Sequence, residues 1–152
     1  MKTLVNDADR VEILARMGRV KIDSERRWGK MSAHQMVCHL ADSFRGVMGE
    51  RPLSLMPRNF GRGVVKWVAL YSGLPWPHGL KTMPEVDQLI GGTRPAEFAA
   101  DVQELRKLFA RFTAEGRDFV WGRHPMFPRM SEADWMRWGY LHMDHHFRQF
   151  GV

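Results

Sequence analysis

The sequence contains a single cysteine, Cys38, so no disulfide can form within the chain. It has no run approaching the roughly 20 apolar residues that a membrane span needs, and its opening stretch MKTLVNDADR lacks the apolar segment of a secretory signal. We therefore expect a cytoplasmic protein with no membrane partner. No repeat or linker divides the chain, so residues 1–152 are expected to form one domain with its own core.

Long basic runs are also absent. Lys and Arg outnumber Asp and Glu by 23 to 17, which gives a formal net charge of +6, but no basic run is longer than a doublet such as Arg26 and Arg27. No helix-turn-helix or zinc-finger spacing accompanies these residues. We expect no nucleic-acid partner, whereas an anionic small molecule remains compatible with the charge.

The alternating pattern of strands is weak throughout, and helix signals dominate. Between the second and third long helices lies a connection rich in Pro and Gly, in which residues 63–71 are expected to form a short helix. The long helices are expected near residues 7–20, from Ser32 to about Glu50, after Thr93, and from Ser131 to about Phe150. This pattern predicts an all-α fold, a four-helix bundle with a long crossover connection.

Capping signals place the helix ends. Ser32 with Gln35 and Ser131 with Asp134 have the spacing of capping boxes, in which each side chain satisfies a free backbone donor. In the first helix Asp7 or Asp9 is the expected cap, and Gly18 marks the end. In the third, Thr93 is the expected cap, with Pro95 in the first turn.

The last helix carries the most informative pattern. At 100° per residue, His142, His146 and Gln149 fall within one narrow arc with Trp135, which marks the buried face. Arg137, Asp144 and Arg148 fall on the opposite side, where Asp144 and Arg148 can pair. His145 lies at the edge of the buried face and is expected to support the site or lie at an interface.

Two buried imidazoles one turn apart are costly unless their nitrogens find partners, and a shared metal ion is one such partner. The alternative is that each histidine is a core residue with its own hydrogen bond. The stretch HMDHH at 142–146 lacks the glutamate that follows the first histidine of HExxH zinc peptidases, so peptidase chemistry is excluded.

A third histidine close to this pair would favour a shared metal ion over separate hydrogen bonds in the core. His39 lies on a flank of the second helix among small or polar residues, where it would look into a cavity, as an open metal position requires. His34 points well away from His39 and is expected at the surface. Asp42, one turn after His39, is a candidate general base, or alternatively a residue that orients a ligand.

The segments WGKMSAHQMVCHLAD (28–42) and HPMF with LHMDHHFRQF (124–127 and 141–150) resemble the DinB-like (YfiT-like) superfamily of metal-binding four-helix bundles, and within it an uncharacterised subfamily. The resemblance implies that His39, His142 and His146 bind one divalent ion, most often zinc or nickel. From their positions on the helices, Asp42, His145 and Gln149 are expected to support these ligands without binding the ion. The resemblance also implies a homodimer. Phe147 and Arg148 depart from the basic residue and glycine that follow the last histidine in many relatives.

The resemblance further implies two candidate functions. One is a metal-dependent thiol-S-transferase or hydrolase, acting through a thiol or water on the ion, with a low-molecular-weight thiol or another small molecule as partner. Arg45 or Arg123 would then hold a carboxylate of that partner, the alternative being that each is a solvated surface residue. The other is a non-catalytic, stress-associated protein that binds a metal or small ligand.

Two further features of the sequence have more than one interpretation. The loop at residues 122–130, which contains His124, is expected either to form part of a pocket rim or simply to position the last helix. Trp67 and Trp76 in the crossover are expected to line a lid, to form a dimer contact or to cap the bundle.

Overall fold

The computed structural model of the chain describes residues 1–57 and 61–152. In these two ranges all regular structure is helical and no strand occurs, so the all-α prediction is confirmed. The elements are α1 (Asp7–Met17), α2 (Ala33–Val47), α3 (Arg62–Tyr71), the 3-10 helix η1 (Pro84–Val86), α4 (Phe98–Thr113) and α5 (Glu132–Gln149). None of the described helices combines the length and apolar character that a membrane crossing requires.

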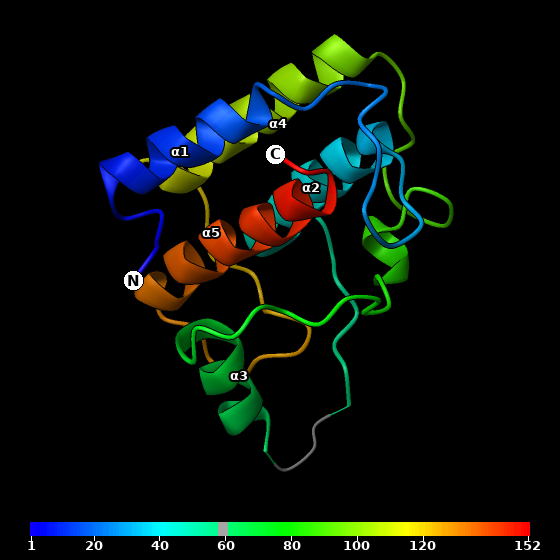
Figure 1. Cartoon of the computed structure of the whole chain (residues 1–152). Helices are drawn as coiled ribbons and strands as arrows, with labels where there is room; N and C mark the ends of the chain where they lie inside the picture. The colour runs from blue at the N-terminus through cyan, green and yellow to red at the C-terminus, as the bar shows by residue number, and fades with distance from the viewer. Residues whose placement is uncertain (58–60) are drawn as a thin grey trace.

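Four helices form the bundle, and α3 belongs to the crossover, as predicted. In the bundle α2 packs against α4 and α1 packs against α5, while α3 extends below and contacts α5 (Figure 1). The short η1 lies against α2. The crossover therefore runs past both helices that were expected to carry the metal ligands.

An aromatic cluster holds three of these helices together. Phe44 of α2 lies 4.8 Å from Phe112 of α4 and 6.4 Å from Trp138 of α5, measured between ring centroids. Phe44 and Phe112 are almost completely buried. Packing of aromatic rings at such distances stabilises a core beyond the burial of area alone, so it fixes α2 and α5 as neighbours.

Both predicted capping boxes are present. Ser32 accepts from the Gln35 backbone N–H while the Gln35 side chain accepts from Ser32, and Ser131 and Asp134 make the same pair of contacts. These local interactions set where α2 and α5 begin. Once the first residue of a helix is fixed, the helical period determines the face on which each later residue of that helix lies.

The predicted cap of the third long helix is wrong. Helix α4 begins at Phe98, and the Glu97 carboxylate caps it by accepting from the backbone N–H groups of Ala99 and Ala100. Thr93 instead donates from its backbone N–H and its hydroxyl to the buried carboxylate of Asp42. Thr93 therefore bonds to Asp42, which is distant in the sequence, and does not cap the nearby helix.

The first helix also differs from expectation at its start. Asn6 is the N-cap residue of α1, without a side-chain cap hydrogen bond, and Asp9 accepts from the backbone N–H of Thr3 and from the side-chain amide of Asn6. Gly18 ends the helix as predicted. Asp9 is thus used to hold the preceding segment rather than to cap.

Arg137 is the main error in the face assignment of α5. It was placed on the exposed side, but it is only 7 % exposed. Its Nε donates to the carbonyl of Leu70 at 2.8 Å, and its Nη1 donates to the carbonyl of Lys2. Crossover and N-terminal segments cover this side of α5, which periodicity alone cannot reveal. The predicted pair of Asp144 and Arg148 is confirmed at 3.1 Å.

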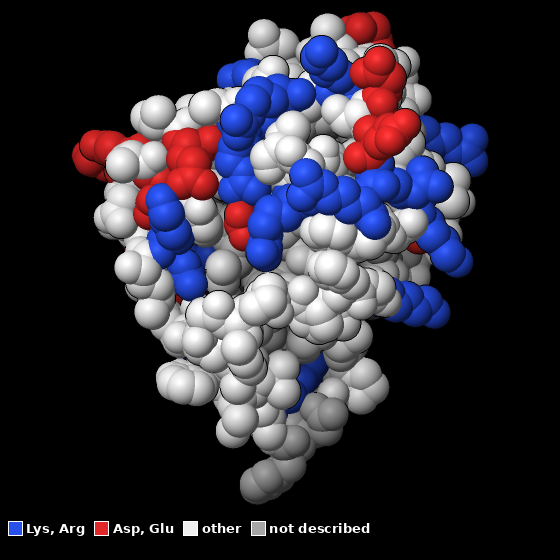
Figure 2. All heavy atoms as spheres, in the orientation of Figure 1, with Lys and Arg blue, Asp and Glu red and all other residues white. Residues whose placement is uncertain are grey.

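Charged side chains are unevenly distributed on the surface. On the face shown in Figure 2, Lys, Arg, Asp and Glu gather over the upper part, whereas the lower part, where α3 lies, carries few charges. Trp67 of α3 is exposed, so it does not cap the bundle, whereas Trp76 packs against the core.

Candidate metal centre

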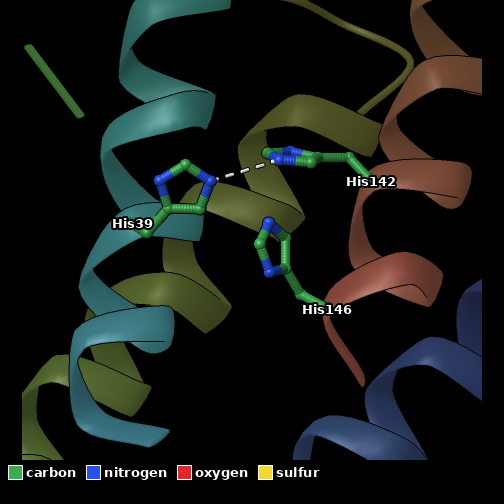
Figure 3. Close-up of side chains that lie close together, drawn as sticks. All are labelled: His39, His142 and His146. Carbon is green, nitrogen blue, oxygen red and sulfur yellow. Dashed lines mark hydrogen bonds between the residues drawn. The ribbon is translucent and has the colours of Figure 1, made fainter. Parts of the chain in front are cut away.

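Three histidines from two helices converge in the middle of the bundle. His39 projects from α2, and His142 and His146 project from α5, with their rings turned toward one another (Figure 3). One ring nitrogen from each lies within 4.8 Å of the others, and the Nε2 atoms of His39 and His142 are 3.3 Å apart. For zinc–nitrogen bonds of about 2.0–2.1 Å, two tetrahedral ligand atoms lie roughly 3.3–3.4 Å apart.

The structure thus brings together the three residues that the sequence analysis selected. The i, i+4 spacing on α5 places His142 and His146 one turn apart on the same face, and the aromatic cluster holds α2 opposite them. His39 and His146 are buried, and His142 is partly buried. Partial exposure of His142 is compatible with a site in which one coordination position is open to a further molecule.

Hydrogen bonds behind the rings fix which nitrogens face inward. His39 donates from Nδ1 to the carbonyl of Val86 at 2.8 Å, and His146 donates from Nδ1 to Oε1 of Gln149 at 2.9 Å. The Gln149 amide is itself oriented, because its Nε2 donates to the carbonyl of Trp28 at 2.8 Å. His39 and His146 therefore keep their protons on Nδ1 and direct Nε2 lone pairs into the site.

The electrostatic environment favours neutral imidazoles. Burial lowers the pKa of His39, and burial together with neighbouring histidines lowers the pKa of His142 and His146 well below the ordinary value. Neutral imidazole is the form that binds a metal. Converging lone pairs of neutral rings fit a divalent cation, so the donor set present here suits the ion that the resemblance implies.

Asp42 makes no hydrogen bond to the three histidines among the described residues. Its carboxylate has no exposed surface and accepts from the Thr93 backbone N–H at 2.7 Å, the Thr93 hydroxyl at 2.8 Å and the Gln88 amide at 3.2 Å. A carboxylate enclosed in this way is not placed to act as the general base. It anchors the segment 86–93, whose first residue, Val86, holds His39.

His145 lies beside the site, as its position at the edge of the buried face suggested. Its ring centroid is 5.3 Å from that of His146, 5.9 Å from Trp28 and 6.0 Å from Trp76. Trp28 stacks in turn on His78 at 3.9 Å. These rings cover His39, His142 and His146 from one side of the site.

A cavity of about 630 Å³ opens onto all three histidines. Its volume lies in the range of about 300–1,000 Å³ that is typical of small-molecule sites. His124 and Trp76 line it, which confirms the pocket-rim interpretation of the 122–130 loop. His124 is not a ligand, because its Nδ1 accepts from the backbone N–H groups of Met126 and Phe127.

Neither arginine that was expected to hold a carboxylate lines this cavity. Arg45 pairs with Asp42 and with Glu104, and Arg123 lies outside the lining. The lysines of the lining are Lys30 and Lys81, from two irregular segments. Sequence reasoning missed them, because no periodic signal places loop residues at a site formed by distant helices.

A second polar group lies on the other side of α2. His34, expected at the surface, places its Nε2 2.7 Å from Oδ2 of Asp101 on α4, and the Cys38 Sγ lies 3.7 Å from the same oxygen. The backbone N–H of Ala96 also donates to this oxygen at 3.1 Å. Three neighbours therefore engage one carboxylate oxygen, and the group joins α2 to α4.

The comparisons with known proteins give one match. A family model described as "Protein of unknown function (DUF1569)" matches residues 5–151. No curated protein and no solved structure matches the chain. The description of the family supplies no activity, so the functional argument rests on the site itself.

Proposed function

The chain belongs to the DUF1569 family, and from its site we propose a metal-dependent protein that acts on a small molecule. His39, His142 and His146 would hold one divalent ion at the edge of the cavity. The observation that carries this proposal is the convergence of three ring nitrogens within 4.8 Å, two of them with their lone pairs directed inward by hydrogen bonds at the opposite nitrogen.

Zinc or nickel is the proposed ion. Imidazole ligands suit both metals, and three protein ligands leave a position for a further molecule. The helical bundle and the arrangement of the three histidines support the finer assignment to the DinB-like superfamily. In that superfamily we place the chain among members whose ion is carried by one histidine of the second helix and two of the last.

A transferase or hydrolase is the reaction class that we propose. A bound divalent ion lowers the pKa of a water or thiol, so that the nucleophile exists at neutral pH. The protein's own contribution is orientation and exclusion of water: Val86 and Gln149 hold two of the rings, while Trp76 and Trp138 line the cavity beside His142.

One observation favours the second candidate, a non-catalytic metal or ligand carrier. Among the described residues, no carboxylate hydrogen-bonds to the three histidines, and the carboxylate of Asp42 is enclosed. A catalyst of this kind would have to draw its base from the substrate, from solvent, from a neighbouring histidine or from Asp87, the one carboxylate of the cavity lining.

Elemental analysis of the purified protein tests the proposal. We expect about one zinc or nickel per chain, lost in His142→Ala and retained in His145→Ala, which removes a neighbouring ring outside the ligand set. A chelator should lower the melting temperature of the wild type and leave that of His142→Ala unchanged, because a ligand that binds only the native state stabilises it. Full metal content in single alanine variants of all three histidines would overturn the site.

Turnover separates the two candidates. The metal-loaded wild type is assayed for thiol transfer to electrophiles and for hydrolysis of esters and amides, with His142→Ala as the matched control. Activity that requires both the ion and His142 supports the enzyme. Stoichiometric metal without any turnover supports the carrier.

A further inference from the structure

The cavity beside the histidines follows the axes of two helices. Its lining takes one residue per turn of α2, namely Gln35, His39, Ser43 and Val47, and a matching row of α5, namely Trp138, His142, His146 and Gln149. With a rise of about 1.5 Å per residue, the row on α2 spans roughly 18 Å. The histidines lie in the middle of this trough, so a bound molecule can extend from them in both directions.

One end of the trough is apolar. Beyond Ser43 the lining includes Val47 of α2, Trp138 of α5, and crossover residues such as Leu53 and Met56. The 122–130 loop adds Pro125, Met126 and His124, whose ring lies 5.9 Å from that of Trp138 and stays neutral because burial lowers its pKa. Leu53 packs so closely on α2 that a Cβ placed on Gly46 would lie 2.6 Å from its Cδ1. The backbone N–H of Met56 donates to the carbonyl of Pro125 at 3.0 Å, which closes this end against the 122–130 loop.

The other end is polar and positively charged. Gln149 contacts the carbonyl of Trp28 here, and the stacking of Trp28 on His78 brings the 78–82 segment to the same end. The lining at this end includes Lys30 and Lys81, and neither has an ion-pair partner within residues 1–57 and 61–152. The one acid of the lining is Asp87, which follows Val86 behind His39, so the two lysines outnumber it. Two unpaired ammonium groups at the mouth of a low-dielectric cavity attract an anion.

Gln88 has a buried polar atom that calls for a hydrogen-bond donor inside the cavity. It lines the cavity, is only 4 % exposed, and has a buried Oε1 with no hydrogen-bond partner among the described residues. Its amide cannot simply turn over, because Nε2 donates to the Asp42 carboxylate. A buried carbonyl oxygen without a donor is unfavourable, so a hydrogen-bond donor from water or from a bound molecule is expected there.

We propose that this cavity binds amphipathic anions, with the apolar part toward Val47 and Leu53 and the anionic group toward Lys30 and Lys81. Methionines recur in the lining, and their flexible side chains adapt to apolar groups of different shape. The lining methionines are Met31, Met56, Met83 and Met126. The inference rests on the proposed function in one respect: the reacting bond of such a molecule would lie at the histidines, between its two parts.

Binding of straight-chain carboxylates tests the proposal. Butanoate, hexanoate, octanoate and decanoate are titrated calorimetrically into the zinc-loaded full chain, with octanol and octylammonium as matched probes. Burial of one CH₂ contributes about 0.8 kcal/mol, so each added carbon should tighten binding roughly fourfold until the cavity is filled. Octanoate should bind at least tenfold more tightly than octylammonium. Affinities that are independent of chain length, or equal for both charges, would overturn the proposal.

Two variants test which end of the cavity binds the anionic group and which binds the alkyl chain. The double variant Lys30→Gln, Lys81→Gln should weaken octanoate at least tenfold and leave octanol unchanged. Leu53→Trp should weaken decanoate and spare butanoate, with circular dichroism and melting temperature as controls for folding. An anion preference that survives loss of both lysines but disappears in His142→Ala would place the carboxylate at the histidines and overturn the assignment of the lysine end.

The same variants separate this inference from the metal proposal. Suppose that the wild type binds no metal, but that the affinity of His142→Ala for the carboxylates still rises with the length of their alkyl chain. The proposed metal function then fails, and the assignment of the cavity stands. If one ion is bound per chain and chain length has no effect, the cavity assignment fails alone.

Discussion

The Nε2 atoms of His39 and His142 lie 3.3 Å apart although 103 residues separate them in the chain. His39 presents a lone pair there, because its proton is committed to the carbonyl of Val86. Without an ion, His142 has to donate to that lone pair, whereas a cation lets both rings act as ligands. Which ring nitrogens present lone pairs to the site therefore depends on the hydrogen-bond partners behind the rings as much as on the rings themselves.

Gln149 should control metal affinity without touching the ion. In Gln149→Leu the Nδ1 proton of His146 loses its acceptor, and loss of such a partner typically weakens metal binding about 10- to 100-fold. Competition with a chromophoric chelator measures the affinity for zinc, and elemental analysis at saturating zinc should still find one ion per chain.

Gln149→Glu is the matched control, because a carboxylate still accepts from His146 but cannot donate to the carbonyl of Trp28. We expect zinc affinity within a few-fold of wild type and a free energy of unfolding lower by about 0.5–1.5 kcal/mol, because the partly buried carbonyl of Trp28 loses its donor. Equal loss of zinc affinity in both variants would show that Gln149 acts through its contact with Trp28 and not by accepting from His146.

His124 should make stability depend on pH. Burial lowers its pKa from the ordinary 6.5 to about 3, so between these values the unfolded chain takes up a proton that the native chain does not. The stability contributed by this group is complete above pH 6.5 and is lost as pH falls toward 3. In His124→Asn the side-chain oxygen still accepts from Met126 and Phe127, but nothing titrates.

Urea unfolding between pH 4 and 6 measures this effect. The slope of unfolding free energy against pH should be smaller in His124→Asn by up to about 1.4 kcal/mol per pH unit, which corresponds to one proton. Identical slopes in the two proteins would mean that His124 is protonated in the native state. The difference between them isolates this residue from the other buried histidines.

The parts of the site that the sequence predicted are those set by local periodicity. The i, i+4 spacing of His142 and His146, and the capping box that begins at Ser131, are properties of α5 alone and hold in the structure. His39 was chosen over His34 by its position on α2, which is also local. Helix geometry decides such relationships before any tertiary contact forms.

The parts that could not be predicted depend on chain-distant partners. His39 is oriented by a carbonyl 47 residues away, and Gln149 by one 121 residues away. Thr93 was misassigned as a cap because its acceptor, Asp42, is 51 residues away. Backbone carbonyls leave no signal in the residue types, so such contacts require the fold itself.

Asp42 should be among the most sensitive positions of the fold. It pairs with Arg45 at 3.2 Å and with Arg51 at 3.1 Å, and its side chain has no exposed surface. Asp42→Asn removes the charge, which leaves Arg51 without an ion-pair partner among the described residues and Arg45 with Glu104 alone, and breaking a buried ion pair costs about 3–5 kcal/mol. Urea unfolding measures the loss, which should also weaken zinc binding because the segment that carries Val86 loses its anchor.

The matched control is Glu104→Gln, because Glu104 pairs with the same Arg45 at 2.7 Å but is 41 % exposed. Exposed pairs contribute about 0–1 kcal/mol, so this variant should unfold almost like wild type. Equal destabilisation by the two substitutions would refute the role of Asp42 as the buried anchor of the 86–93 segment.

Gly139 should tolerate no side chain, because α5 is approached there by two other segments. A Cβ at this position would lie 2.8 Å from Cδ1 of Leu4 and 2.8 Å from Cε1 of Phe112, and both residues are fully buried. Overpacking of this kind costs about 1–3 kcal/mol, so Gly139→Ala should lower the urea midpoint. Gly18→Ala is the control: its φ of −67° suits alanine, and its nearest neighbour is the movable end of Arg106. Equal effects of the two substitutions would exclude close packing as the reason for Gly139.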